Sequence, residues 1–318
     1  MKKKKLKIPV KARENTDVCF ERFLRVKRAD GITQKTMDTY SQHFRAIGKH
    51  LDTSKYIDEI TDTDLKLMIL SMQESGLATN SIRSYTATLK SFFSWCNSEG
   101  ITELNLRKYR AEETIKETYT SDELAILLKK PNTRTCSFSE YRNWVIENLL
   151  INSGSRAGTI RNIQNRDVDI YNHVIYARHT KNKKMLLIPL CSKMISILTE
   201  YMNIRGGKPD DYLFPNEYGE MMTENALRCT IAKYNKRRGV QKTSIHLFRH
   251  TFAKMYLIDC GGNALMLQKL LGHSTLDMTK HYCAIFDAEM TRNFDDFSPL
   301  SKLSVGNEKI KMPRGKTR

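Results

Sequence analysis

The chain has 318 residues, of which 40% are hydrophobic and 28% are charged. This length and balance suit two domains with packed cores and argue against a wholly disordered chain. The formal net charge is +18, from 53 Lys and Arg against 35 Asp and Glu, and it predicts a polyanionic partner such as nucleic acid or an anionic membrane surface.

Other sequence signals are missing. No run of about 18 apolar residues is present, so no transmembrane helix is expected. The N-terminal lysines lack the apolar core of a secretory signal. The seven cysteines are scattered and form no Cys-x-x-Cys pair, so neither a zinc site nor a disulfide framework is indicated. We therefore expect a protein of the reducing cytoplasm.

Residues 1–14 form a lysine-rich arm that contains Pro9 and shows no hydrophobic periodicity. One interpretation is a disordered tail that aids solubility. The other is a flexible arm on DNA, because each lysine can neutralise a phosphate and release counterions. The sequence leaves both open.

Residues 15–102 are expected to form a compact helical domain. Four segments carry apolar residues at helical spacing, the third from Thr61 to Met72 and the fourth from Thr79 to Cys96. Thr33 or Thr36 could cap the second segment. Basic residues are scattered over these helices, so the sequence does not indicate which face would meet DNA.

Residues 103–118 are polar, charged and weakly periodic, and we expect them to be a linker. Its basic residues either follow a DNA backbone or belong to a solvated tether. A second domain is expected at 119–290, followed by a C-terminal segment and basic tail at 291–318.

The second domain begins with helices. Acidic residues directly after Ser121 suit the first turn of a helix. Ser137 or Ser139 is expected to cap a longer helix that ends at Gly154. Arg156 then falls at the start of another helix, where free backbone N–H groups favour an anion. A surface arginine is the simpler interpretation of this residue taken alone.

A small sheet is expected next. Val174–Ala177 and Leu186–Ile188 are short apolar runs, and a basic turn lies between them. The turn contains Lys181, Lys183 and Lys184, which could be solvated or contact a phosphate backbone. Helices are expected to follow at Ser192–Met202, Glu224–Lys236, Leu247–Ile258, Ala264–Leu271 and Thr275–Tyr282. The expected fold class is therefore mainly α with a small β-sheet.

The stretch from His246 to Tyr282 gathers residues suited to phosphate chemistry. It contains His246, Arg249 and His250, then His273, then Tyr282. Arginine presents a charged fork that matches phosphate oxygens, and histidine can move a proton near neutral pH. A tyrosine hydroxyl can act as a covalent nucleophile. A metal site at His246 and His250 is a weaker alternative, because Arg249 would place a permanent cation beside the metal.

These motifs resemble the tyrosine recombinase (phage integrase) family. Gly154-Ser155-Arg156 resembles its first box, His246-Leu247-Phe248-Arg249-His250 its second, and Leu271-Gly272-His273 with Tyr282 nine residues later its closing signature. The family also has a catalytic lysine about eight residues before a Pro-Leu pair, and counting back from Pro189-Leu190 gives Lys181, with Lys183 and Lys184 as the rival positions. The chain departs from the pattern at Thr159, where the family usually has an acidic residue.

The resemblance implies a two-domain DNA clamp, with a helical core-binding (SAM-like) domain and a mixed α+β catalytic domain. It implies Arg156, Lys181, His246, Arg249, His273 and Tyr282 as catalytic residues. The implied reaction cleaves and rejoins double-stranded DNA through a 3′-phosphotyrosine, without a cofactor, metal or ATP. A homotetramer on two sites would carry it out, with accessory DNA-bending or directionality factors as further partners.

Three functions fit this resemblance. The favoured one is the recombinase or integrase of a mobile element. A chromosome dimer resolvase of the Xer type is the second. The third is a weakly catalytic DNA-binding protein of the same fold, which the departure at Thr159 suggests.

Overall fold

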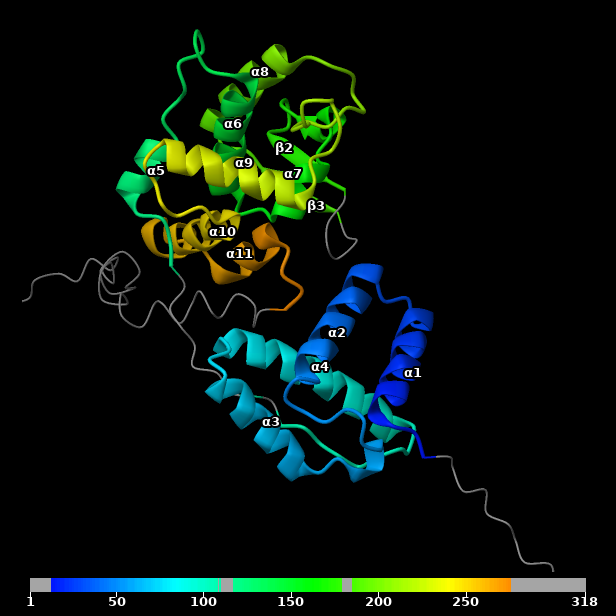
Figure 1. Cartoon of the computed structure of the whole chain (residues 1–318). Helices are drawn as coiled ribbons and strands as arrows, with labels where there is room; N and C mark the ends of the chain where they lie inside the picture. The colour runs from blue at the N-terminus through cyan, green and yellow to red at the C-terminus, as the bar shows by residue number, and fades with distance from the viewer. Residues whose placement is uncertain (1–12, 108, 110–116, 179–184, 276–318) are drawn as a thin grey trace, which may run out of the picture. The chain divides into compact units, whose positions relative to one another are not determined.

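The computed structural model describes residues 13–107, 109, 117–178 and 185–275, and Figure 1 shows its helices and strands. The chain divides into two compact units between residues 114 and 115, and each unit has its own hydrophobic core. The expected domain limits at 15–102, 103–118 and 119–290 remain predictions. Most of the arm at 1–14, part of the linker and the whole segment at 291–318 lie outside the described residues.

The first unit is helical, as its apolar periodicity predicts. Its helices are α1 (Thr16–Ala29), α2 (Gln34–Ile47), α3 (Asp62–Glu74) and α4 (Thr79–Ser98), with a 3-10 turn at Ile57–Glu59. Thr33 is the residue before α2, and Thr61 caps α3 by accepting from the Asp64 N–H. Buried aromatic rings fill the core, and the rings of Phe20 and Phe44 stack with centroids 3.7 Å apart.

The second unit is built around one buried helix. Its helices are α5 (Ser121–Leu127), α6 (Phe138–Ser153), α7 (Ala157–Asn162), α8 (Ser192–Arg205), α9 (Glu224–Arg237), α10 (Ile245–Lys254) and α11 (Ala264–Leu271). Eleven residues of α6 are buried, and α8, α9 and α10 all pack against this helix. A helix that is buried on all sides carries little amphipathic periodicity, so its caps locate it better than its apolar pattern.

The sheet is small and antiparallel, with strand order β1-β2-β3. The expected strands are confirmed as β2 (Val174–Ala177) and β3 (Leu186–Pro189), paired so that Ile175 faces Ile188. A further strand, β1 (Val168–Asp169), adds to the other edge of β2. Two residues are too few to show a period, so the sequence did not predict β1. The expected fold class, mainly α with a small β-sheet, is confirmed.

The helix expected at Leu247–Ile258 differs from the prediction. It begins two residues earlier, at Ile245, and α10 ends at Lys254. The chain then continues as a π-helix over Met255–Asp259, a wider turn that hydrophobic periodicity does not distinguish from an α-helix. The helix expected at Thr275–Tyr282 lies almost entirely outside the described residues. Within the part that the structure describes, no helix is long and apolar enough to cross a bilayer.

Candidate active site

The candidate site lies where the C-terminal end of α6 meets α10 and α11. Gly154 ends α6 in the left-handed conformation, with a φ of 59°. A Cβ at this position would lie 2.5 Å from the Phe252 ring and 2.7 Å from the Leu271 side chain. Glycine is therefore required twice, by the backbone angle and by the close packing. The chain then turns so that Arg156 is the N-cap residue of α7.

Arg249 is the central cation of this site. It lies on α10 and only 5% of it is exposed. Its Nη1 donates to the Gly154 carbonyl at 2.9 Å, and its Nη2 donates to the Leu271 carbonyl at 3.0 Å. A buried charge is costly unless it is hydrogen-bonded, and these main-chain carbonyls from two other helices offset that cost.

His273 and Arg156 contact the same place. Gly272 ends α11 in the left-handed conformation, and His273 follows it. The His273 Nε2 lies 2.6 Å from the Arg249 Nη2. A guanidinium can only donate, so this contact requires that Nε2 is unprotonated. Arg156 approaches from α7, where its Nη1 donates to the Leu271 carbonyl at 3.4 Å.

Two guanidinium groups therefore meet at one carbonyl oxygen, and an imidazole contacts one of them. Main-chain carbonyls accept hydrogen bonds from both arginines and so fix the two guanidinium groups. Each guanidinium has five N–H donors in all. Such a fixed pair of cations suits an anion with several oxygens, and charge developing on that anion would be stabilised without rearrangement of the site. The geometry therefore favours chemistry at a phosphate group.

The structure brings together three of the six predicted residues, Arg156, Arg249 and His273. His246 lies three residues before Arg249 on α10, so it is on the same side of the helix, but it is exposed. Lys181 and Tyr282 lie outside the described residues. Among the residues with described positions, no group of three His, Cys, Asp or Glu side chains is placed to hold a metal ion.

Thr159, which replaces the expected acidic residue, is buried in α7 and 5% exposed. Its backbone N–H donates to the Arg156 carbonyl at 2.9 Å, within the first turn of the helix. The acceptors found for Arg249 in this site, the carbonyls of Gly154 and Leu271, do not depend on the side chain at position 159.

An ion pair between a buried carboxylate and an exposed arginine lies at the end of β2. Asp167 is 2% exposed, and its Oδ2 accepts from the Gln164 N–H at 2.9 Å. Its Oδ1 lies 2.8 Å from the Nε of Arg178, the residue directly after β2. The carboxylate therefore joins the segment that leaves α7 to the strand that leads toward residues 179–184.

Sequence reasoning missed the groups that hold these side chains. The carbonyls of Gly154 and Leu271 have no side-chain signature, although Gly154 and Gly272 mark the helix ends that present them. The pair of Asp167 and Arg178 could not be predicted either, because it depends on how β1 and β2 are registered.

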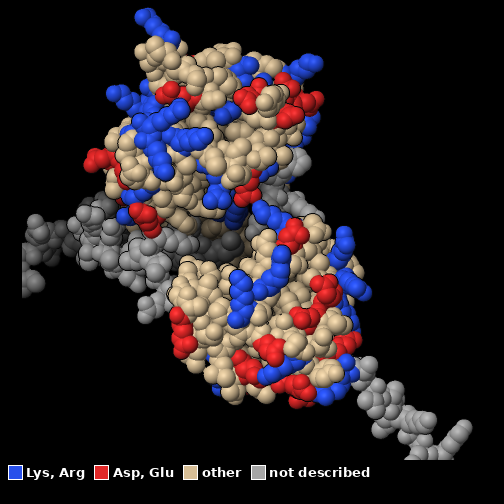
Figure 2. Space-filling model, viewed as in Figure 1, with Lys and Arg blue, Asp and Glu red and all other residues tan. Residues whose placement is uncertain are grey.

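The surface of the second unit carries a basic patch. Figure 2 shows Lys and Arg side chains gathered over the C-terminal half of α9. Lys233, Lys236 and Arg237 are exposed there. This charge could attract a polyanion, in line with the net charge of the chain.

Comparison with known proteins identifies a family for both units. The phage integrase family matches residues 117–289, and the N-terminal SAM-like domain of phage integrases matches residues 20–100. The tyrosine recombinase XerC of Thermodesulfovibrio yellowstonii is 29% identical over 240 residues, which cover 71% of this chain and 78% of that protein.

Solved structures show the same fold. The Tn1549 transposon integrase in complex with transposon right end DNA is 19% identical, with a TM-score of 0.72 over 88% of this chain and 99% of that one. A lambda integrase tetramer bound to a Holliday junction is also 19% identical, with a TM-score of 0.68 over 86% of this chain and 78% of that one.

Proposed function

Because the chain belongs to the phage integrase family of tyrosine recombinases, which are site-specific DNA recombinases, we propose that it is the recombinase of a mobile element. It cleaves and rejoins double-stranded DNA through a 3′-phosphotyrosine formed by Tyr282. The observation that carries this proposal is that Arg156 and Arg249 meet at the Leu271 carbonyl while His273 contacts Arg249, because this arrangement provides fixed cations for a phosphate.

The mechanism follows from these charges. The two arginines bind the non-bridging oxygens of the scissile phosphate and stabilise the more highly charged transition state. The Tyr282 oxygen attacks phosphorus, and the bond to the 5′-oxygen of the next nucleotide breaks. Lys181 gives a proton to that oxygen. His246 and His273 position the phosphate and assist proton transfer.

The phosphotyrosine conserves the energy of the phosphodiester, so rejoining needs no nucleotide. The 5′-hydroxyl of a second duplex attacks the phosphotyrosine and releases Tyr282, which exchanges strands. Four copies of the chain on two sites complete the reaction. The lambda integrase tetramer on a Holliday junction supports such an assembly for a protein of this fold.

A resolvase of the Xer type is the second candidate. The XerC protein matched above supports it, since the match spans 78% of that protein's length. DNA beside the gene separates the two candidates. Flanking repeats and cargo genes support the mobile element, whereas their absence beside a gene whose loss causes chromosome dimers supports the resolvase.

A nicked suicide substrate tests the chemistry itself. With the wild-type chain, excess EDTA and no nucleotide, we expect a covalent protein–DNA adduct on a denaturing gel. Tyr282→Phe should form no adduct and should bind the same DNA within about twofold, because only one hydroxyl is removed. An adduct with the Phe variant would identify another nucleophile. No adduct with the wild type would favour a DNA-binding protein without this activity.

A further inference from the structure

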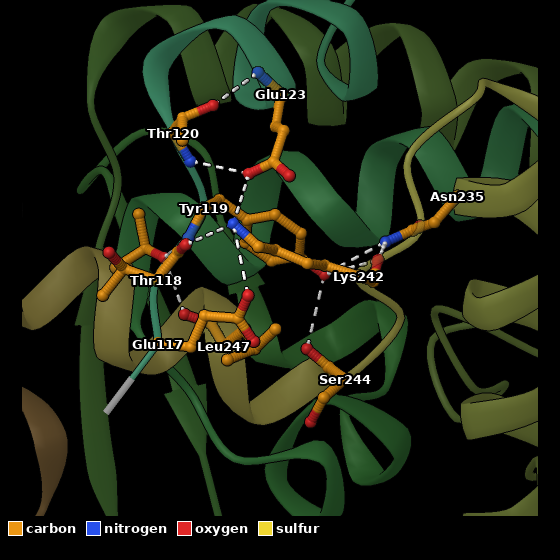
Figure 3. A network of polar contacts seen from close by, with 10 residues as sticks. Glu117, Thr118, Tyr119, Thr120, Glu123, Asn235, Lys242, Ser244 and Leu247 are labelled. Atoms are coloured by element: carbon orange, nitrogen blue, oxygen red, sulfur yellow. Dashed lines mark hydrogen bonds and ion pairs between the residues drawn. The ribbon is translucent and has the colours of Figure 1, made fainter. Parts of the chain in front are cut away.

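A polar and aromatic cluster, which we call the Tyr119 latch, contacts α10 and the loop that leads into it, and Figure 3 shows its polar contacts. It consists of Tyr119, Glu123, Asn235, Lys242 and Thr251. Tyr119 lies near the point where the chain enters the second unit, and it is 4% exposed. The hydrogen bonds and ion pairs described below for this cluster run within it, to α5, to α10 and to the segments that lead into these two helices, not to the side chains of Arg156, Arg249 or His273.

Tyr119 contacts α10 through its backbone and its ring. Its N–H donates to the Thr251 hydroxyl at 2.9 Å, and that hydroxyl donates to the Leu247 carbonyl at 2.7 Å. Its ring packs on the Phe248 ring with centroids 4.5 Å apart. In an α-helix of about 3.6 residues per turn, Thr251 lies nearly opposite Arg249, and Phe248 lies on the flank between them, about 100° from Arg249.

The Tyr119 hydroxyl fixes the loop that leads into α10. It lies 3.3 Å from the Lys242 carbonyl and 3.5 Å from the Ser244 carbonyl, and it accepts from the Asn235 Nδ2 at 3.0 Å. The same Asn235 nitrogen donates to the Lys242 carbonyl at 2.9 Å. The loop that ends at Ser244, the residue before α10, is therefore held by a closed set of hydrogen bonds.

Lys242 ties this loop back to the segment that contains Tyr119. Its Nζ donates to the Thr118 carbonyl at 3.0 Å and to Glu123 at 2.9 Å, and lies 3.5 Å from Glu117. Glu123 also accepts from the Thr120 N–H at 2.8 Å in a capping box at the start of α5. Burial alone would raise the pKa of Glu123, but the Thr120 and Lys242 donors outweigh it and lower this pKa. The ion pair between Glu123 and Lys242 therefore persists at neutral pH.

We propose that Tyr119, Lys242 and Thr251 are positioning residues. They hold α10 so that Arg249, bonded to the carbonyls of Gly154 and Leu271, is in place to bind the scissile phosphate. The proposal rests on the function proposed above. One face of α10 is fixed by the Tyr119 latch and the other by Arg249, so a loss on the first side shifts the guanidinium on the second. A displacement of about 1 Å can cost about 100-fold in rate, so modest loosening is measurable.

The test uses the full-length chain, saturating protein and two suicide substrates. One has an ordinary scissile phosphodiester. The other has a methylphosphonate there, in which a methyl group replaces a non-bridging oxygen and removes the negative charge that Arg249 stabilises. Thr251→Val keeps the side-chain volume but removes the hydroxyl that joins Tyr119 to α10. Thr251→Ser keeps the hydroxyl.

On the phosphodiester we expect Thr251→Val to cleave about 10-fold more slowly and Thr251→Ser to stay within about threefold of wild type. On the methylphosphonate Thr251→Val should come within about threefold of wild type, because the misplaced guanidinium matters less. Lys242→Met should show the same pattern with a smaller loss. Arg249→Ala is the reference variant. It should lose more activity than Thr251→Val on the phosphodiester and recover more on the methylphosphonate.

Thr230→Val is the matched control, because it removes the bond from Asn143 Nδ2 to the Thr230 hydroxyl, 2.9 Å long, on α9 rather than α10. It should match wild type on both substrates. An equal loss for Thr251→Val on both substrates, or no loss at all, overturns the proposal. Absence of a wild-type adduct, or of any recovery by Arg249→Ala, instead refutes the proposed function.

Discussion

Glu147 is a fully buried acidic residue that should make stability depend on pH. It lies in the middle of α6 and is fully buried, and its two carboxylate oxygens accept no hydrogen bond from the residues that the structure describes. Burial raises the pKa of Glu147 well above its usual 4.5, and attraction to Arg238 opposes this only in part. The folded protein therefore keeps this carboxyl group protonated at pH values where the unfolded chain loses the proton.

The sign of the pH dependence follows. Below about pH 4.5 both states are protonated, so the group adds no pH dependence. As pH rises above that value, the unfolded state ionises and the wild type loses stability, by up to about tenfold in its unfolding equilibrium constant per pH unit. Glu147→Gln lacks this group, so its stability relative to wild type should increase between pH 5 and pH 8.

Urea unfolding of both proteins at several pH values measures this difference. Glu147→Leu should give the same slope against pH as Glu147→Gln, since neither side chain titrates. A difference from wild type that stays constant with pH would show that Glu147 is ionised in the folded protein.

Individual catalytic candidates were predictable to different degrees. Arg156, Arg249 and His273 stand in motifs whose order and spacing indicate one site, and the structure places all three together. Glu147 gave no such signal, because a glutamate among apolar residues is equally typical of a solvated helix face. Its enclosure depends on α8, α9 and α10, which no local pattern reveals.

At the scale of elements, we predict that the connection between β2 and β3 supplies the general acid, Lys181. Lys181→Ala should cleave an ordinary substrate about 10²- to 10⁴-fold more slowly, the usual value of general acid catalysis. If sulfur replaces the 5′-bridging oxygen, the leaving thiolate needs no proton, and this variant should approach the wild-type rate. Arg249→Ala should not recover, because the non-bridging oxygens are unchanged.

Arg178→Ala extends this test to the base of the hairpin. Its partner Asp167 is buried, so we expect a smaller loss that sulfur also restores. Arg166→Ala is the matched control, since its ion pair with Asp210 is exposed and lies outside the hairpin. Lys183→Ala and Lys184→Ala should only weaken binding in a salt-sensitive way. If the sulfur substrate rescues Lys183→Ala instead of Lys181→Ala, then the general acid is Lys183 and the assignment to Lys181 is wrong.

Helices and strands were predicted well where a capping residue or a hydrophobic periodicity indicated their limits. Thr61 and Ser137 cap α3 and α6 by accepting backbone N–H groups, and Gly154 ends α6, all at or within one residue of the expected limits. The π-helix after α10 and the two-residue strand β1 were missed. Both depend on tertiary contacts rather than on local propensity.

The whole molecule carries a net charge of +18, and this charge predicts how salt acts on the two steps of the reaction. Binding to a specific duplex should weaken about 10³-fold or more between 50 and 200 mM salt if about six phosphates are neutralised. The cleavage rate at saturating protein should change less than about twofold, because Arg249 is buried and weakly screened.

Fluorescence anisotropy and single-turnover cleavage measure the two quantities separately. Salt-independent binding would show that the basic surface does not bind the DNA backbone. The charge itself was evident from composition, and so was the presence of two domains. The distribution of the charge could not be predicted from the sequence, because the patch over α9 depends on which side of that helix is buried.

The Leu271 carbonyl also has a consequence for how this site evolves. Arg156 and Arg249 converge on a main-chain oxygen, which every amino acid supplies. Genetic drift can therefore change the side chain at position 271 without deleting the acceptor, and an alanine scan would register only lost packing there. Replacement of the amide between Leu271 and Gly272 by an ester, which weakens that one oxygen as an acceptor, would expose a contribution that ordinary mutagenesis cannot reach.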